Sequence, residues 1–238
     1  MKRKEASISP WAPRQIMRSV LGYALPRRAF MLNGPTGCGQ VALTFDDGPD
    51  PELTPRLLDV LAAQGTVATF FVIGSRAEQH PGIVRRIVAN GHALGNHSFS
   101  HGEPSTTSAY ALAAEVSRTR RLLFDLAGVS SRLIRPPHGS VTAAKLLALW
   151  SQGNSVVLWN RDPKDFACSS ADQVAQVFEE RPLQSGNLVL LHDSYPFAAE
   201  ILPSIIADCR RRGLEFTTAE VWRNARGVPE RSPSSQRF

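Results

Sequence analysis

The chain has 238 residues, of which 42% are hydrophobic and 20% charged, and its formal net charge is +6. A chain of this length accommodates one α/β domain with a substantial core and leaves little room for a second large one. The composition excludes a largely disordered or membrane-spanning protein. Its three cysteines (Cys38, Cys168 and Cys209) lack the short spacings of a zinc knuckle or a redox pair, so we expect reduced, unpaired thiols.

Both ends of the chain differ in composition from its centre. Residues 1–28 contain three prolines and a short amphipathic piece at 15–21, which we expect to pack on the domain; peripheral contact with a membrane surface is the alternative. Residues 227–238 are rich in Pro, Ser and Arg, which indicates a flexible tail. Residues 29–226 are therefore expected to form the domain.

The sequence also bears on location and partners. No apolar run approaches the roughly 20 residues that span a bilayer, and no run of about 7–15 apolar residues follows the basic start, as an export signal requires. We therefore expect a cytoplasmic protein. The basic residues form scattered clusters without a nucleic-acid-binding motif, which argues against a nucleic-acid partner.

Between the two ends, short apolar runs alternate with helical patterns. Residues 41–45 are expected to form the first strand, and a helix follows at 55–64, where Thr54 is a candidate cap and Pro55 suits the first turn. Further strands are expected at 67–73, 92–95, 133–135, 155–159, 188–191 and 215–217, and further helices at 81–90, 106–127, 142–151, 171–180 and 198–212. This alternation predicts an α/β fold of about seven parallel strands covered by helices, as a barrel or an open sheet.

Polar residues gather directly after the expected strands. The carboxyl ends of parallel strands share one face of such a fold, where active sites are built. Residues far apart in the sequence are therefore expected to converge. Five clusters follow this rule, namely Asp46 with Asp47, His97 with His101, residues 135–139, Asp162 with Asp165, and His192 with Asp193.

Two of these histidines have the spacing of metal ligands. His97 and His101 stand four residues apart, which would place both imidazoles on one side of a helical turn, within reach of one ion. A carboxylate would complete such a site. Two histidines at this spacing also fit a polar loop that binds nothing, so the spacing alone leaves both interpretations open.

The adjacent carboxylates of Asp46 and Asp47 favour the metal interpretation. Two acids that face a poorly hydrated cleft raise one another's pKa unless a cation lies nearby. A cation on one would leave the other to act as a base. The alternative is a plain turn, because Asp, Gly and Pro at residues 46–49 all favour turns, but a turn does not explain two acids directly after a buried run.

Two further clusters hold candidate acid and orienting groups. His192 ends an apolar run, where it would serve as a general acid near neutral pH; a core histidine bonded to a carbonyl is the alternative. The prolines of residues 135–139 (Arg-Pro-Pro-His-Gly) are too stiff for a helix and are expected to hold an extended backbone. Arg135 would orient a carboxylate there, and an exposed backbone N–H would face a developing oxyanion.

One glycine-rich segment, residues 34–41, has the glycine spacing of a phosphate-binding loop. Gln40 and Val41 replace the lysine and the hydroxyl residue of that loop, and a strand rather than a helix is expected to follow. We therefore interpret the segment as a turn, with nucleotide binding as the alternative.

Taken together, five motifs resemble, in the same order, those of the polysaccharide deacetylases of carbohydrate esterase family 4, which include chitin, chitooligosaccharide and peptidoglycan deacetylases. Residues 44–49 (Thr-Phe-Asp-Asp-Gly-Pro) match the first motif and residues 97–101 the second. Residues 135–139 resemble the third motif, with His138 in place of the usual aromatic residue. Residues 161–166 resemble the fourth, with Phe166 in place of tryptophan, and residues 190–193 match the fifth. The resemblance spans about residues 40–220.

The resemblance implies a distorted (β/α) barrel, with residues 29–226 as a catalytic domain that removes N-acetyl groups from an amino-sugar-containing glycan or glycan precursor. It also implies a divalent metal bound by Asp47, His97 and His101. The metal is usually zinc, with cobalt, manganese and nickel as alternatives.

The same resemblance assigns the catalytic roles. It implies that Asp46 takes a proton from the attacking water, that Arg135 holds Asp46, and that His192, oriented by Asp165, protonates the leaving amine. The residues that it places against the substrate are Pro137, His138, Phe166 and Leu190.

The altered aromatic residues leave other functions open. One is a related amide hydrolase of the same fold that acts on a formyl group or a non-sugar amide. Another is a non-catalytic carbohydrate-binding protein that kept the pocket without turnover. The sequence does not indicate the oligomeric state.

Overall fold

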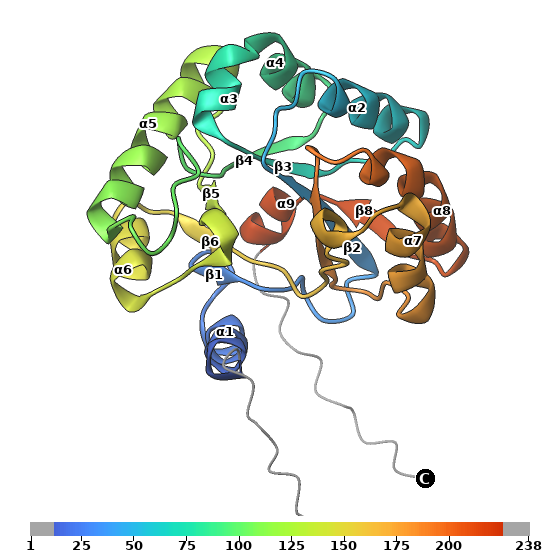
Figure 1. Cartoon of the computed structure of the whole chain (residues 1–238). Coiled ribbons are helices and arrows are strands. Elements are labelled where there is room, and N and C mark those ends of the chain that lie inside the picture. Colours follow the sequence, from blue (N-terminus) through green and yellow to red (C-terminus); the bar gives the residue numbers. More distant parts are fainter. Residues whose placement is uncertain (1–11, 226–238) are drawn as a thin grey trace, which may run out of the picture.

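The computed structural model describes residues 12–225, which form a curled sheet surrounded by helices (Figure 1). Its strands are β1 (Phe30–Met31), β2 (Gln40–Asp46), β3 (Thr69–Val72), β4 (Ala93–Asn96), β5 (Leu133–Ile134), β6 (Ser155–Val157), β7 (Leu188–His192) and β8 (Glu215–Thr217). Its helices are α1 (Ala12–Ala24), α2 (Leu53–Ala63), α3 (Gly74–Gln79), α4 (Pro81–Ala89), α5 (Ala109–Ala127), α6 (Ala143–Ser151), α7 (Ala171–Glu180), α8 (Phe197–Arg211) and α9 (Ala219–Asn224), with 3₁₀ turns η1 (Pro137–Gly139) and η2 (Asp165–Ala167).

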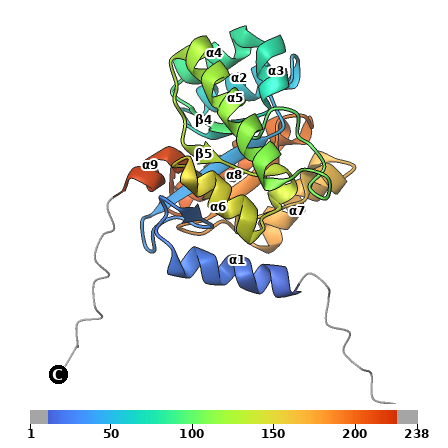
Figure 2. The ribbon, with the colours of Figure 1, turned by 90° about the vertical axis from the view of Figure 1, so that its left-hand side faces the viewer.

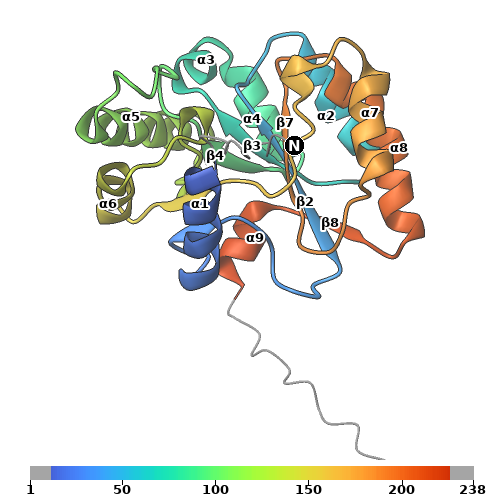
Figure 3. The ribbon, with the colours of Figure 1, turned by 60° about the horizontal axis from the view of Figure 1, so that its bottom comes forward.

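Every strand pair within the described residues is parallel. The order is β1-β6-β5-β4-β3-β2-β7, and β8 pairs with the start of β2. A bridge between Arg161 and Val189 connects the segment after β6 to β7 and so joins the two sides of the curl. The prediction of parallel strands in a distorted barrel is confirmed, with eight strands in these residues rather than about seven. Figure 3 shows the helices arranged around the outside.

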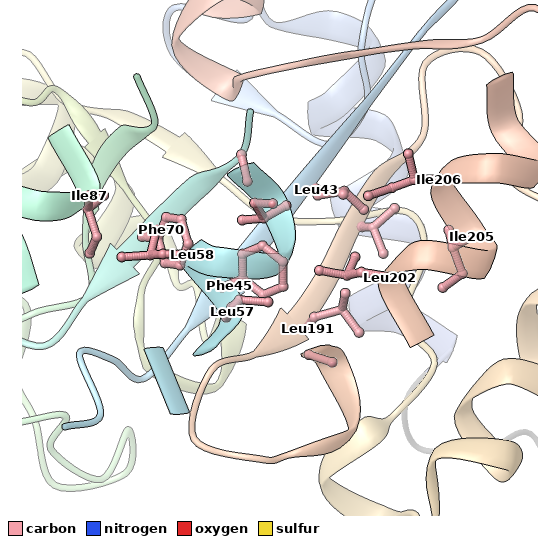
Figure 4. Close-up of a cluster of buried hydrophobic side chains, with 14 of the residues drawn as sticks. Leu43, Phe45, Leu57, Leu58, Phe70, Ile87, Leu191, Leu202, Ile205 and Ile206 are labelled. Atoms are coloured by element: carbon pink, nitrogen blue, oxygen red, sulfur yellow. The ribbon is translucent and has the colours of Figure 1, made fainter. Parts of the chain in front are cut away.

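The core fixes the strands on both sides of the sheet. On the outer side, Leu43 and Phe45 of β2 pack in one cluster with Leu58 of α2 and Leu202 of α8 (Figure 4). On the inner side, a second cluster fills the curl and includes Phe71 of β3. Burying one such large side chain contributes about 1.5–3 kcal/mol. The strand ends that carry the polar clusters are therefore held by apolar packing on both faces.

Three short elements escaped prediction. Phe30 and Met31 form β1, which pairs with Val156 and Val157 of β6, and both residues are fully buried. The six-residue helices α3 and α9 span fewer than two turns, which is too short to show a helical pattern. All the predicted strands and helices are present, with ends shifted by a few residues.

The expectation that Thr54 caps a helix at 55–64 is wrong. The helix begins at Leu53, so Thr54 lies buried in its first turn. The Asp50 carboxylate instead accepts hydrogen bonds from the N–H groups of Glu52 and Leu53, at 2.9 and 2.7 Å. The helix expected at 106–127 likewise begins only at Ala109, with Ser108 as its cap.

The parts outside the barrel are described only in part. The expected tail at 227–238 and residues 1–11 lie outside the described residues. The amphipathic piece forms part of α1, whose Leu21 and Leu25 pack against the cluster that covers β6, so the expected packing on the domain is confirmed. Between residues 12 and 225, no helix has the length and apolar character needed to cross a membrane. The glycine-rich segment forms a turn that leads directly into β2, as expected.

Candidate active site

Several of the predicted site residues meet at the carboxyl ends of the strands. Asp46 is the last residue of β2 and lies opposite His192, the last residue of β7. Asp47 follows Asp46, and its positive φ of 76° turns the chain away from the strand. His97 follows β4 directly, and Arg135 follows β5. The parallel register therefore brings five residues from four strand ends to one face.

Asp47, His97 and His101 form a group that fits a metal ion. One ligand atom from each of the three lies within 4.8 Å of the other two, and no other such group was found among residues 12–225. Asp47 Oδ1 lies 3.4 Å from His97 Nε2 and 3.3 Å from His101 Nε2. His97 Nδ1–H donates to the Arg135 carbonyl at 2.6 Å, which leaves Nε2 as the coordinating nitrogen. Two imidazoles and a carboxylate are a donor set that suits zinc and related divalent ions.

The charges around this group favour a cation. Burial opposes a proton on His97, but the carboxylates of Asp46 and Asp47 raise its pKa above the ordinary value. The same carboxylates would favour a divalent cation in place of that proton. Burial alone would raise the pKa of Asp47, but the hydrogen bond and charge of His97 hold this pKa well below the usual range. Burial and the neighbouring His97 lower the pKa of His101 to about 4, so its ring is neutral at pH 7 and able to coordinate.

The expected helical turn at residues 97–101 is wrong, although the two rings do converge. The segment is a loop, in which Ser98 and His101 have positive φ values of 64° and 55°. Glu115 of α5 holds the loop, because its carboxylate accepts hydrogen bonds from the N–H groups of Phe99 and Ser100, both at 3.1 Å. The loop backbone, not a helical repeat, brings His101 to Asp47.

Asp46 and Arg135 form a buried ion pair beside this group. Arg135 Nη1 lies 2.6 Å from Asp46 Oδ1, and the Arg135 side chain is fully buried. Arg135 also donates to the hydroxyl of Thr44 at 2.8 Å and to the backbone carbonyls of Val157, which ends β6, and Leu158. The carboxylate is therefore fixed through one oxygen, while its Oδ2 lies 3.6 Å from His97 Nε2. An ion pair bonded on so many sides holds its geometry rigidly.

The expectation of an extended backbone over residues 135–139 is confirmed at Pro136, whose φ and ψ are −62° and 141°, but is wrong for the residues that follow. Residues Pro137–Gly139 form a 3₁₀ turn in which His138 has a φ of 55°. The His138 N–H donates no hydrogen bond to any group in residues 12–225, so it stays available to an oxyanion. The exposed His138 ring lies 4.8 Å from the ring of His101, measured between centroids. The turn therefore places both the backbone donor and a side chain beside the Asp-His-His group.

His192 and Asp165 form a second pair on the other side. His192 Nδ1–H donates to Asp165 Oδ1 at 2.7 Å, and the His192 backbone N–H donates to Asp165 Oδ2 at 2.7 Å. Burial would lower the pKa of His192, but the hydrogen bond and charge of Asp165 raise it to about 9. The ring is therefore protonated at pH 7. This pair excludes the alternative of a core histidine bonded to a carbonyl through Nδ1.

Two acids of the predicted clusters point elsewhere. Asp193 is buried behind the site, where it accepts from Thr54 Oγ1 at 2.6 Å, and burial raises its pKa to about 7. A Cβ at position 48 would overlap the Asp193 carboxylate, which explains the glycine there. Asp162 accepts from Trp159 Nε1 at 3.2 Å and from the Lys164 N–H, and so stabilises a turn.

The residues expected to contact substrate differ in exposure. Phe166 is 49% exposed and lies edge-on to His192, with 5.5 Å between the ring centroids. Pro137 is buried, and Leu190 is 3% exposed, on the same face of β7 as His192. Tyr195, which the sequence did not single out, is 36% exposed and lies edge-on to His192 at 6.0 Å. Its position three residues after His192 was the only signal for it in the sequence.

Comparison with known proteins decides the family. A model of the family described as polysaccharide deacetylase matches residues 33–157. The chain belongs to this family. It is 34% identical to a peptidoglycan-N-acetylglucosamine deacetylase of Bacillus cereus over 80% of this chain and 70% of that protein. It is 38% identical to a chitooligosaccharide deacetylase of Sinorhizobium fredii over 68% of this chain and 75% of that protein.

A solved structure of the polysaccharide deacetylase family shares the fold. The crystal structure of the Bc1960 peptidoglycan N-acetylglucosamine deacetylase matches with a TM-score of 0.79 and 29% identity, and covers 93% of this chain and 99% of that one. The match extends well beyond residues 33–157, over which the family model aligns. The resemblance inferred from the five motifs is confirmed.

Proposed function

We propose that this chain is a metal-dependent N-deacetylase, which hydrolyses the acetamide of an amino sugar in a glycan or a glycan precursor. Its family membership supports this proposal, as do the names of its relatives. The single observation that carries it is the Asp-His-His group beside Asp46, a carboxylate that lies outside that group and is held by Arg135. A carbohydrate-binding protein without turnover would not require this arrangement.

We propose zinc as the bound metal, held by Asp47, His97 and His101. When bound, such an ion polarises a carbonyl and makes a nearby water more acidic. The two nitrogen donors and one oxygen donor favour zinc, cobalt, nickel or manganese over magnesium or calcium, which prefer oxygen ligands.

Asp46 acts as the base in the proposed reaction. It takes a proton from the water whose oxygen forms a bond to the acetamide carbon. Arg135 holds Asp46 through Oδ1, so Oδ2 is the oxygen free to accept this proton. The negative charge that develops on the carbonyl oxygen faces the His138 N–H.

His192 acts as the acid that completes the reaction. As the C–N bond breaks, the protonated ring gives its proton to the sugar amine, and acetate leaves as the second product. Asp165 accepts from Nδ1–H, which leaves Nε2–H as the proton that is transferred. Asp46 thus accepts a proton and His192 donates one, and the two residues lie opposite each other at the ends of β2 and β7.

Four residues form the proposed contacts with substrate. The exposed rings of His138 and Phe166 lie on opposite sides of the site, next to His101 and His192 respectively. Leu190 lies on the same face of β7 as His192 and would contact the acetyl methyl group. Pro137 shapes the turn that presents His138 and contributes through the backbone.

The experiment that tests the function measures acetate and formate release from metal-loaded protein. The substrates are N-acetylated chitooligosaccharides, peptidoglycan fragments, soluble N-acetylamino-sugar precursors and matched N-formyl compounds. We expect acetate release that depends on the added metal, with at most weak formate release. Formate as the main product would favour the related amide hydrolase. Tight sugar binding without either product would favour the carbohydrate-binding alternative.

The raised pKa of His192 gives a pH-dependence prediction. An acid must be protonated to act, so kcat/KM is retained below the His192 pKa and falls as the pH rises through about 9. Replacing Asp165 with Asn removes the charge that raises this pKa and leaves burial, which lowers it. The alkaline limb of the profile should then move down by about one to two pH units.

Asp162→Asn is the matched control for Asp165→Asn, because Asp162 lies three residues away and bonds to Trp159 rather than to His192. The pH profile of this control should coincide with that of the wild type. An unchanged alkaline limb in Asp165→Asn would contradict the role given to the His192–Asp165 pair.

A further inference from the structure

The net positive charge of the chain is confined to its first 28 residues. This segment contains seven basic residues and one acidic residue, whereas the other 210 residues contain 20 of each. The formal charge of +6 therefore belongs to the amino-terminal segment and not to the catalytic domain. The basic residues are Lys2, Arg3, Lys4, Arg14, Arg18, Arg27 and Arg28.

The helix in this segment, α1, exposes an apolar stripe. Met17, Val20 and Tyr23 are 39%, 58% and 96% exposed. Their spacing of three places them on one face of the helix. Three of the nine exposed large hydrophobic residues found among the described residues thus lie on this one helix. Single exposed apolar residues are common, but a stripe of them indicates a contact surface.

The opposite face of α1 is already occupied by the domain. Leu21 and Leu25 pack against the apolar cluster that covers β6, and Gly22 lies against Leu32. The Arg18 guanidinium lies over the ring of Trp159, 4.7 Å from its centroid. In Figure 2, α1 runs along one side of the domain, with its outer side turned away from the barrel. The outward stripe therefore has no partner within residues 12–225.

We propose that this outward face of α1 binds the surface of a membrane that contains anionic lipids. A helix with an apolar face and neighbouring basic residues lies in the headgroup region, where its apolar side chains insert and its cations attract lipid headgroups. A tyrosine suits this depth, since its ring is apolar and its hydroxyl polar. The attachment is peripheral and holds the catalytic domain at the surface. It is independent of the proposed chemistry.

Sedimentation with vesicles tests this surface. The full chain should co-sediment with vesicles of equal parts phosphatidylglycerol and phosphatidylcholine in low salt. Binding should be weaker to phosphatidylcholine alone and should decrease in 0.5 M NaCl, because salt screens the attraction of the basic residues. The double variant Val20→Asp/Tyr23→Asp should bind the anionic vesicles at least about tenfold more weakly, because it places two charges on the inserted face.

A double variant elsewhere on the surface provides the matched control. Tyr110 of α5 and Leu147 of α6 are 85% and 64% exposed, so Tyr110→Asp/Leu147→Asp introduces the same two charges away from α1. This control should bind vesicles like the wild type, and both variants should keep the wild-type melting temperature within a few degrees. An equal loss of vesicle binding in both double variants would overturn the proposal, as would wild-type vesicle binding by Val20→Asp/Tyr23→Asp.

A second copy of the chain is the other occupant that the experiment distinguishes. If a second copy covers the stripe, light scattering on protein that elutes from a size-exclusion column would show a dimer. The double variant Val20→Asp/Tyr23→Asp would then be a monomer. A wild-type dimer of this kind without vesicle binding would also overturn the proposal. Deacetylase activity on soluble substrate should be equal in all three proteins, so a failure of membrane binding is separable from a failure of the proposed reaction.

Discussion

Replacing Asp46 with Asn is expected to lower kcat by about 10²–10⁴-fold while the bound metal is retained, because a missing general base typically reduces the rate by this factor. Asp46 does not belong to the Asp-His-His group, so the metal ligands stay intact. The amide oxygen of Asn can still accept from Arg135, which keeps three other hydrogen-bond partners. We therefore expect the variant to fold, with some loss of stability from the broken ion pair.

The measurement for Asp46→Asn combines kcat on an N-acetylated oligosaccharide, metal content and melting temperature. Asp125→Asn, at an exposed position on α5, makes the same chemical change away from the site and should behave like the wild type. Near wild-type turnover in Asp46→Asn would reject the base role. Loss of metal from this variant would instead assign Asp46 to the metal ligands.

Replacing His101 with Gln is expected to weaken metal binding and reduce activity by roughly a thousandfold at low metal concentration, because a bound ion supplies several kcal/mol of transition-state stabilisation. His101 is a better choice than His97, since it is half-buried and, within residues 12–225, its ring makes one polar contact, with Asp47. His97 is fully buried and bonds the Arg135 carbonyl, so its loss would also disturb the fold.

Metal affinity, measured by competition with a chromophoric chelator, separates this effect from a loss of folding. High metal concentration should restore part of the activity of His101→Gln, since Asp47 and His97 remain. His80→Gln is the control, because His80 is half-buried at the junction of α3 and α4, outside the site. Unchanged metal affinity in His101→Gln would contradict the assignment of this residue.

The strand ends of the site were predictable from the sequence. Asp46, Arg135 and His192 each follow an apolar run, and parallel topology brings the ends of such runs to one edge. Short apolar runs located the longer strands, and helical spacing of apolar residues located the longer helices. The register of β2 and β7 then places Thr44, Phe45 and Asp46 opposite residues 190–192.

The loop conformations were not predictable, because they depend on distant partners. Residues 97–101 form a loop rather than a helical turn since Glu115 of α5 binds two of its N–H groups. Residues Pro137–Gly139 form a turn with a positive φ at His138, and Gly139 lies against the ring of Trp159. Thr54 was expected to cap a helix, but its hydroxyl serves Asp193, 139 residues later in the chain. No local pattern encodes contacts of this kind.

The measurement that tests the central claim most directly is anomalous diffraction from crystals of zinc-loaded protein, collected on both sides of the zinc absorption edge. The account predicts one strong peak at about 2.0–2.2 Å from Asp47 Oδ1, His97 Nε2 and His101 Nε2, with Asp46 beside it and not coordinated. A peak at another site, or no peak within the Asp-His-His group in protein that releases acetate, would contradict the account.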